Sequence, residues 1–263
     1  MRPPPWGEIR TRQLLLIQTA CALVAAYGLS IYASTAVEFL LDAIVGLGAP
    51  LTVGVHRALQ VLLSHLAWVL MATRILGVRL KPFFPPPFGK GQWLRLRWRS
   101  SWLGWALGGY FASLLTYNLA DNLNAALMPP KLLEAAASAA AAVDDAESVV
   151  ARLVRPEGGD LLALGVGAIG PCASAPIFEE VLYRGFLLPT LVRLGLPLPL
   201  ALSAHAALFG LHHRTQAATL PLAALGGLWG GLYVFSGNLL VPMLVHCLWN
   251  SRIFLASLME MVP

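Results

Sequence analysis

Long apolar runs follow one another along most of the chain and are separated by short stretches rich in glycine, proline and charged residues. Many of these runs approach the roughly 20 residues that a helix needs to cross a bilayer. Their apolar length and Gly/Pro punctuation predict spans at 13–35, 52–75, 101–118, 161–175, 177–194, 198–213, 217–235 and 239–259. The pattern therefore predicts an all-α, polytopic membrane bundle of about eight transmembrane helices.

Two of these runs fit a full span less well than the others. The run 161–175 is short, and the run 52–75 carries Arg57, so a half-span or an interfacial piece is an alternative there. Composition supports the membrane interpretation, because 57% of the residues are hydrophobic and 12% are charged. A chain of 263 residues that forms so many spans leaves little material for a separate soluble domain.

The charges of the connecting loops predict an orientation. Residues 73–100 contain seven basic residues and no acidic residue, whereas 119–160 contain seven acidic and three basic residues. Basic loops stay on the cytoplasmic side of a bilayer or its organellar equivalent. Arg2, Arg10 and Arg12 fall on the same predicted side as the basic loop. Both termini are thus expected on the cytoplasmic-equivalent side, with 119–160 outside.

This topology also accounts for the net charge of +5, so we expect a lipid bilayer and no nucleic acid as partner. Trp93 and Trp98 in the basic loop are typical interfacial anchors. The Ala-rich piece 132–154 is expected to be an amphipathic connecting helix on the outer face. The first run is too long for a signal-peptide core, and we interpret it as a retained helix. Cys21, Cys172 and Cys247 have neither disulfide nor metal-ligand spacing.

Three charges interrupt the apolar pattern in "PIFEEVLYRGF", residues 176 to 186. An ionisable residue at membrane depth is costly and usually functional, although an ion pair that only holds helices together is the structural alternative. Glu180 and Arg184 are four residues apart and share a helix face, whereas Glu179 lies about 100° around the helix. Arg184 can therefore neutralise Glu180 and leave Glu179 without a cationic neighbour on its own helix, which suits a general base or acid.

Folding the downstream spans into hairpins brings further polar residues to the same depth. Around the turn signal "GLPLP", Glu180 and His213 stand at nearly equal separations from Leu196. A second turn at "SGN" is followed by His246 and Asn250, again four residues apart on one face. Asn250 reaches nearly the height of Glu180, whereas His246 falls short by roughly 10 Å. These residues are expected to converge in a cavity that opens toward the inner face.

The three motifs resemble those of one protease family. "EEVLYR" is similar to EExxxR, "FGLHH" to FxxxH and "HCLWN" to HxxxN of the intramembrane proteases that include the type II CAAX prenyl protease and bacteriocin-processing enzymes. The resemblance covers about 170–255, and "GNLLVPMLVHCLWN" looks most like plastid members, so a plastid membrane is a candidate location. It implies an eight-helix fold, a catalytic core at 161–263 and glutamate-dependent peptide hydrolysis. Residues 1–160 would then be N-terminal transmembrane helices with a basic inner and an acidic outer loop.

The resemblance also implies roles for individual residues. Glu179 corresponds to the base that activates water, and His213 orients this water or assists proton transfer. His246 and Asn250 correspond to the groups that stabilise the oxyanion. Glu180 and Arg184 correspond to a supporting pair. The other conspicuous residues of these helices, which we expect to be structural, are Phe209, His205 and His212.

Several alternatives remain open. No HExxH, GxSxG or GxGD motif occurs, so we expect catalysis without a cofactor, yet zinc bound by Glu and His is a legitimate catalytic set. A catalytically silent scaffold or immunity-type protein of the same fold is a second alternative, and an ion or proton carrier is a third. Prenylated CAAX tails, other membrane-anchored peptides and transmembrane segments would all suit an inner-leaflet cavity. The sequence predicts no oligomeric state.

Overall fold

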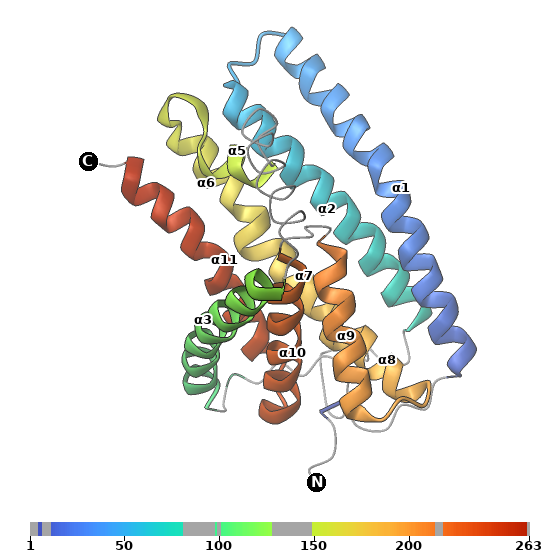
Figure 1. The fold of residues 1–263 in the computed structure, drawn as a ribbon. Coiled ribbons are helices and arrows are strands. Elements are labelled where there is room, and N and C mark those ends of the chain that lie inside the picture. The colour runs from blue at the N-terminus through green and yellow to red at the C-terminus, as the bar shows by residue number, and fades with distance from the viewer. Residues whose placement is uncertain are drawn as a thin grey trace. The chain divides into compact units, whose positions relative to one another are not determined.

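A computed structural model describes residues 5–6, 12–80, 98, 101–127, 149–213 and 218–261, and these residues form helices and no strand (Figure 1). The α-helices are α1 (Gln13–Gly46), α2 (Val53–Arg79), α3 (Trp102–Leu127), α5 (Val149–Val154), α6 (Leu161–Ile169), α7 (Ala175–Glu180), α8 (Leu188–Arg193), α9 (Leu198–His212), α10 (Thr219–Ser236) and α11 (Leu240–Met261). A 3₁₀ turn, η2 (Glu157–Gly159), precedes α6, and the π-helical segments η3 (Gly170–Ser174) and η4 (Val181–Leu187) flank α7.

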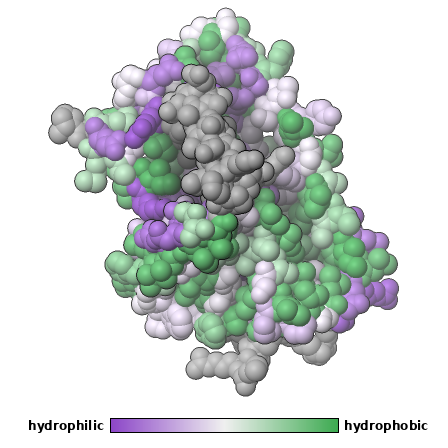
Figure 2. Space-filling view, viewed as in Figure 1, coloured by the Kyte–Doolittle hydropathy of each residue, from purple (hydrophilic) through white to green (hydrophobic). Residues whose placement is uncertain are grey.

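Apolar side chains cover much of the helical surface, which is typical of a protein in lipid. On α1, Val24, Tyr32 and Phe39 are each more than two-thirds exposed, and Figure 2 shows many green, apolar residues at the surface among white and purple ones. Within the part of the chain that the structure describes, five helical stretches are long and apolar enough to cross a membrane: Gln13–Gly46, Val53–Arg79, Leu161–Arg193, Thr219–Ser236 and Leu240–Met261. The predicted all-α, multi-pass membrane fold is therefore confirmed, while the predicted number of about eight spans remains approximate.

The expected spans 161–175 and 177–194 form one helical stretch, Leu161–Arg193. A proline inside an α-helix removes a hydrogen-bond donor and crowds the carbonyl four residues earlier, so the sequence pattern around Pro176 favoured a break. The chain instead widens into π-helix before each proline. Ala175 donates its backbone N–H to the carbonyl of Gly170, and Leu188 does the same to Tyr183, each five residues back. This spacing allows the helix to continue through Pro176 and Pro189.

The chain divides into two compact units, each described here by itself. Unit 1 comprises Met1–Arg10, Pro86–Ala146 and Glu179–Trp249, and unit 2 comprises Thr11–Pro85, Glu147–Phe178 and Asn250–Pro263. The predicted functional division at residue 160 stays a prediction.

In unit 2, α1 and α2 form an antiparallel hairpin, and α6 packs against α2 (Figure 1). The helix starts of α2 and α6 are joined by their caps. Thr52 accepts a hydrogen bond from the backbone of Val55 and donates its hydroxyl proton to Asp160, 2.5 Å away. Asp160 in turn caps α6 by accepting from the backbone of Ala163. These hydrogen bonds to the ionised carboxylate hold the pKa of Asp160 below its ordinary value.

In unit 1, α9 and α3 both pack against α10. Small residues permit the close approach of α9 and α10, because a β-carbon on Gly210 would lie 2.5 Å from the backbone oxygen of Thr219. The α10–α11 turn uses Gly237 in the left-handed conformation, as "SGN" predicts. The buried core of this unit consists of Ala106, Tyr183, Phe209, Leu225, Trp229, Val245 and Trp249.

Some predictions concern residues outside the described part of the chain. The basic loop falls mostly within 81–97 and 99–100, and most of the expected amphipathic helix falls within 128–148. Their structure, and the side of the membrane on which the termini lie, stay predictions.

Candidate active site

A buried ion pair forms the centre of the polar group in unit 1. Arg184 donates from Nη1 to Glu180 Oε1 over 2.9 Å, and both side chains are inaccessible to solvent. The pairing expected from the i,i+4 spacing is thus confirmed. Arg184 also donates from Nη2 to the backbone carbonyl of Gly226 on α10, 2.9 Å away. The guanidinium therefore links its own helix to α10 and keeps the charge of Glu180 compensated.

Aromatic rings surround this guanidinium. The Cζ atom of Arg184 lies 4.7 Å from the centre of the Phe209 ring, 5.6 Å from that of Trp229 and 5.9 Å from that of Tyr183. The negative faces of such rings attract a cation most strongly where water is excluded. Phe209, which the sequence reasoning placed in the packing rather than in the chemistry, packs directly against this charge.

Each ring nitrogen of His246 faces one of the two glutamates. Its Nδ1 atom is 3.0 Å from Glu180 Oε1, and its Nε2 atom is 4.0 Å from Glu179 Oε2. A carboxylate paired with Arg184 can only accept, so Nδ1 of His246 carries the proton in this hydrogen bond. Nε2 is the nitrogen that faces Glu179. The shortfall of roughly 10 Å in helical rise, counted from the turns, does not keep His246 away from the glutamates.

Glu179 has a different environment from its neighbour. Its side chain is 22% exposed, and its buried Oε2 atom makes no hydrogen bond within the described part of the chain. The carboxylate that the sequence nominated as general base is thus outside the hydrogen-bonded Glu180–Arg184 pair. The 4.0 Å separation from His246 is longer than a hydrogen bond.

His213 directly follows α9 as its C-cap residue. Its Nδ1 atom is 2.7 Å from the backbone oxygen of Phe209, which can only accept, so this nitrogen carries a proton. The Phe209 ring is 4.8 Å from the His213 ring and 6.0 Å from the His246 ring. The rings of both histidines therefore lie near the same aromatic ring.

The two histidines left out of the candidate site also lie in this region. The His205 side chain is fully buried, with its ring 5.9 Å from that of Tyr183. His212 lies 6.1 Å from Tyr183 and 5.8 Å from His213, again between ring centres. That both residues are structural stays a prediction.

Asn250 lies in unit 2, where its amide nitrogen donates to the backbone oxygen of Pro171 over 2.8 Å. This carbonyl needs a partner because of the π-helical spacing of η3. The residue five positions further along is Pro176, which has no N–H. Asn250 therefore satisfies a backbone oxygen that the helix itself cannot, and its predicted oxyanion role stays a prediction.

Sequence reasoning missed Trp229 and Ser113. The ring of Trp229 lies against that of His246, with 4.3 Å between ring centres, and its indole nitrogen donates a hydrogen bond to the hydroxyl oxygen of Ser113. The only sequence signal for Trp229 is one large ring between two glycine pairs, in "GGLWGG". Ser113 carries no signal, since hydroxyl side chains are common in membrane helices.

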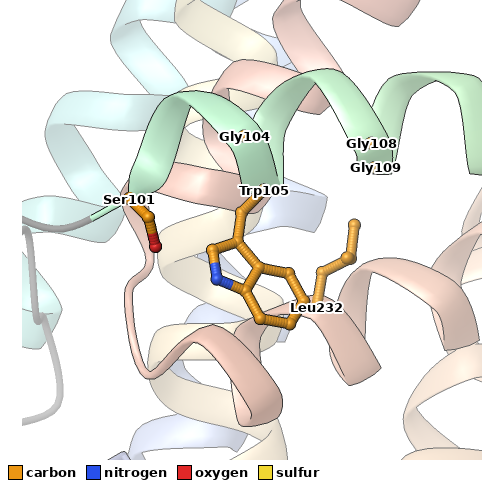
Figure 3. A pocket seen from close by; sticks show the side chains of 6 residues that line it. All are labelled: Ser101, Gly104, Trp105, Gly108, Gly109 and Leu232. Atoms are coloured by element: carbon orange, nitrogen blue, oxygen red, sulfur yellow. The ribbon is translucent and has the colours of Figure 1, made fainter.

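Among the described residues, no three or more His, Cys, Asp or Glu side chains are grouped to hold a metal ion. The zinc alternative therefore has no described set of ligands. A separate pocket of about 430 Å³ runs along α3 and reaches Leu232 on α10; its other lining residues are Ser101, Gly104, Trp105, Gly108 and Gly109 (Figure 3). None of the candidate site residues lines it.

The C-terminal part of the chain is similar to one known protein family. Residues 162–252 match the family model described as type II CAAX prenyl endopeptidase Rce1-like. This confirms the resemblance, and the Rce1-like segment includes all six candidate site residues. No curated protein and no solved structure matches the chain. The chain is therefore a multi-pass membrane protein with an Rce1-like segment.

Proposed function

We propose that this protein is an intramembrane endopeptidase that hydrolyses peptide bonds of membrane-associated substrates with a water molecule activated by Glu179. The observation that carries the proposal is the division of labour between the two glutamates. Oε1 of the fully buried Glu180 is held by Arg184 and by His246, whereas the partly exposed Glu179 is outside that ion pair and lies 4.0 Å from His246 Nε2. The Rce1-like match supports the same activity.

The reaction needs one carboxylate and one water molecule. Glu179 takes a proton from the water, and the water oxygen attacks the carbonyl carbon of the peptide bond. Negative charge then develops on the carbonyl oxygen. The C–N bond breaks as the proton passes from Glu179 to the departing nitrogen, which leaves a carboxylic acid and an amine. The acid then loses its remaining proton to the amine or to water, which gives a carboxylate.

The surrounding residues assist in different ways. His246, held at Nδ1 by Glu180, presents Nε2 toward Glu179 and stabilises the oxyanion when this nitrogen is protonated. His213 has its Nδ1 proton engaged by Phe209, so Nε2 is the nitrogen that orients water. Asn250 is the second proposed oxyanion donor. Its Pro171 hydrogen bond occupies one of the two amide protons.

The proposed substrates are peptides whose scissile bond lies close to the membrane, and prenylated CAAX tails are the first class to test. Purified protein in lipid nanodiscs would be given a farnesylated CAAX peptide, its unprenylated counterpart and a transmembrane peptide, and intact product masses would be recorded. We expect wild type to cleave and Glu179→Ala to be inactive, with no loss on adding a chelator. Absence of cleavage of every peptide would support the scaffold alternative, and loss of activity with chelator would support a zinc enzyme.

A further inference from the structure

Trp229 contacts the catalytic candidates from one side. Its ring lies 4.3 Å from that of His246 at an interplanar angle of 36°, so the two rings are in close, tilted contact. The same indole is 5.6 Å from the Arg184 guanidinium carbon and 5.7 Å from the Phe209 ring. With 1% of its surface exposed, Trp229 has almost no freedom to leave this position.

Ser113 on α3 fixes the indole in its plane. Trp229 donates from Nε1 to the Ser113 hydroxyl oxygen over 2.9 Å, and that hydroxyl donates its only proton to the backbone oxygen of Gly109 over 2.7 Å. The direction of both hydrogen bonds is therefore determined, with a lone pair of Ser113 turned toward the indole. Ser113 is completely buried.

The approach of α3 depends on the absence of a side chain at Gly109. A β-carbon there would come within 2.7 Å of Leu232 on α10 and 2.9 Å of Val245 on α11. Residue 245 immediately precedes His246. The α3 backbone thus lies directly against the part of α11 that carries this histidine, although α3 is outside the segment 162–252 that matches the family model.

We propose that Ser113 and Trp229 are positioning residues for His246: the hydroxyl of Ser113 holds the indole, and the indole face holds the imidazole plane in the orientation in which Nδ1 meets Glu180 and Nε2 faces Glu179. This inference rests on the proposed function in assigning His246 to the chemistry. Glu180 holds the Nδ1 edge of the imidazole, and the indole in close contact restricts the tilt of the ring.

A displacement of about 1 Å in a catalytic group can cost roughly 10²-fold in rate. We expect Trp229→Leu, which removes the aromatic face, to lower kcat by about 10²-fold with KM changed less than about 2-fold. Trp229→Phe keeps a ring but loses the indole N–H, and should lower kcat by about 10-fold. Ser113→Ala, which removes the same hydrogen bond from the other side, should give a similar loss.

The decisive comparison is the double variant. If Ser113 acts through Trp229, Ser113→Ala should have almost no further effect on kcat when Trp229 is already Phe. The matched control is Ser64→Ala in unit 2, because Ser64 also donates to the backbone four residues back and meets a hydroxyl of another helix, Ser34. This control should leave kcat unchanged. Losses at Ser113 and Trp229 that multiply in the double variant would overturn the proposal.

A spectroscopic measurement separates this proposal from the proposed function. Histidine labelled with ¹³C and ¹⁵N gives six side-chain signals, and His246→Gln identifies the one that belongs to His246. Ser113→Ala and Trp229→Phe should both move this signal, whereas Ser64→Ala should not. Movement of the signal in a protein that cleaves no peptide would retain the positioning role and reject the peptidase. An unmoved signal, with wild-type kcat in Ser113→Ala, would reject the positioning role whether or not the protein is a peptidase.

Discussion

His246 Nδ1 lies 3.0 Å from Oε1 of Glu180, the same oxygen that accepts the hydrogen bond from Arg184. One carboxylate oxygen is thus shared by a permanent cation and an imidazole. Both donors thus reach the same oxygen of Glu180. In the proposed mechanism Glu180 has the supporting role and Glu179 the catalytic one.

Loss of the Arg184 side chain should destabilise the protein strongly. Arg184→Ala leaves Glu180 buried with only His246 as a donor, and breaking a buried pair in this way typically costs roughly 3 to 5 kcal/mol. Accumulation in membranes and thermal stability in detergent should therefore fall further than in Glu179→Gln, since Glu179 is outside the pair.

The matched control for this substitution is Arg184→Lys. Lysine retains the positive charge opposite Glu180, but its single nitrogen cannot also make the hydrogen bond to the Gly226 carbonyl in the arginine geometry. The stability of this variant should therefore be intermediate. Wild-type melting of Arg184→Ala would contradict the structural role of the pair.

The crossing of α9 and α10 should tolerate no additional methyl group at Gly210. The new β-carbon would meet backbone atoms, Thr219 O at 2.5 Å and Ala223 N at 2.9 Å, which cannot move as a side chain can. Gly210→Ala should lower stability by about 1 to 3 kcal/mol. Gly227→Ala is the control, because its nearest neighbour, Ala206, would be at an ordinary 3.6 Å. Equal melting of the two variants would show that the helices do not cross so closely.

Protonation of Asp160 should weaken unit 2. The pKa of this carboxyl is lowered in the folded state by the Thr52 hydroxyl and the Ala163 backbone. Its contribution to stability is therefore present above the unfolded pKa of about 3.9 and is lost as pH falls through the folded value. Asp160→Asn should melt below wild type at pH 7, and the difference should shrink below about pH 4.

Thr52 offers an independent check of the same hydrogen bond. Thr52→Val removes the hydroxyl that donates to Asp160, whereas Thr52→Ser retains it. Only the valine variant should reproduce the lowered stability at pH 7. A difference between wild type and Asp160→Asn that stays constant down to pH 3 would contradict the assignment.

Asn250 should affect both rate and stability. If it donates to the oxyanion, Asn250→Ala should lower kcat by about 10²-fold while KM changes little, because the interaction strengthens only as charge develops. The same variant leaves the Pro171 oxygen without its side-chain donor, so its melting temperature should fall as well. Asn250→Asp should be as slow or slower, since a carboxylate repels both oxygens.

Single-turnover cleavage separates the two effects. The melting curve gives the fraction of each variant that is unfolded at the assay temperature. If that fraction accounts for the whole loss of cleavage rate, Asn250 has only a structural role as the partner of η3. Wild-type rates in both variants would remove it from the oxyanion role.

Much of the helical arrangement is readable from the sequence because bilayer thickness and the i,i+4 spacing are strong constraints. The Glu180–Arg184 pair follows from the i,i+4 spacing, and the turn at Gly237 follows from the turn signal "SGN". The continuity of the helix Leu161–Arg193 could not be predicted in this way, because the rules for proline predict a break. They do not indicate that π-helical segments before Pro176 and Pro189 allow the helix to continue.

The candidate site was only partly predictable for a related reason. Motif order indicates His213 and His246, but helical rise counted from a turn takes no account of helix tilt, so it underestimated how closely His246 approaches Glu180. Trp229 and Ser113 were missed because their role depends on contacts between helices distant in sequence. Nothing in the local pattern distinguishes such residues from ordinary packing.

The central claim is that Glu179 activates the water that cleaves the peptide, and Glu179→Gln tests it most directly. The amide keeps the size of the side chain but cannot take a proton from water. The measurement is the single-turnover cleavage rate of a farnesylated CAAX peptide by wild type and Glu179→Gln, at equal amounts of folded protein of equal melting temperature. We predict cleavage by wild type and none detectable by the variant. Cleavage at the wild-type rate by Glu179→Gln would contradict the claim.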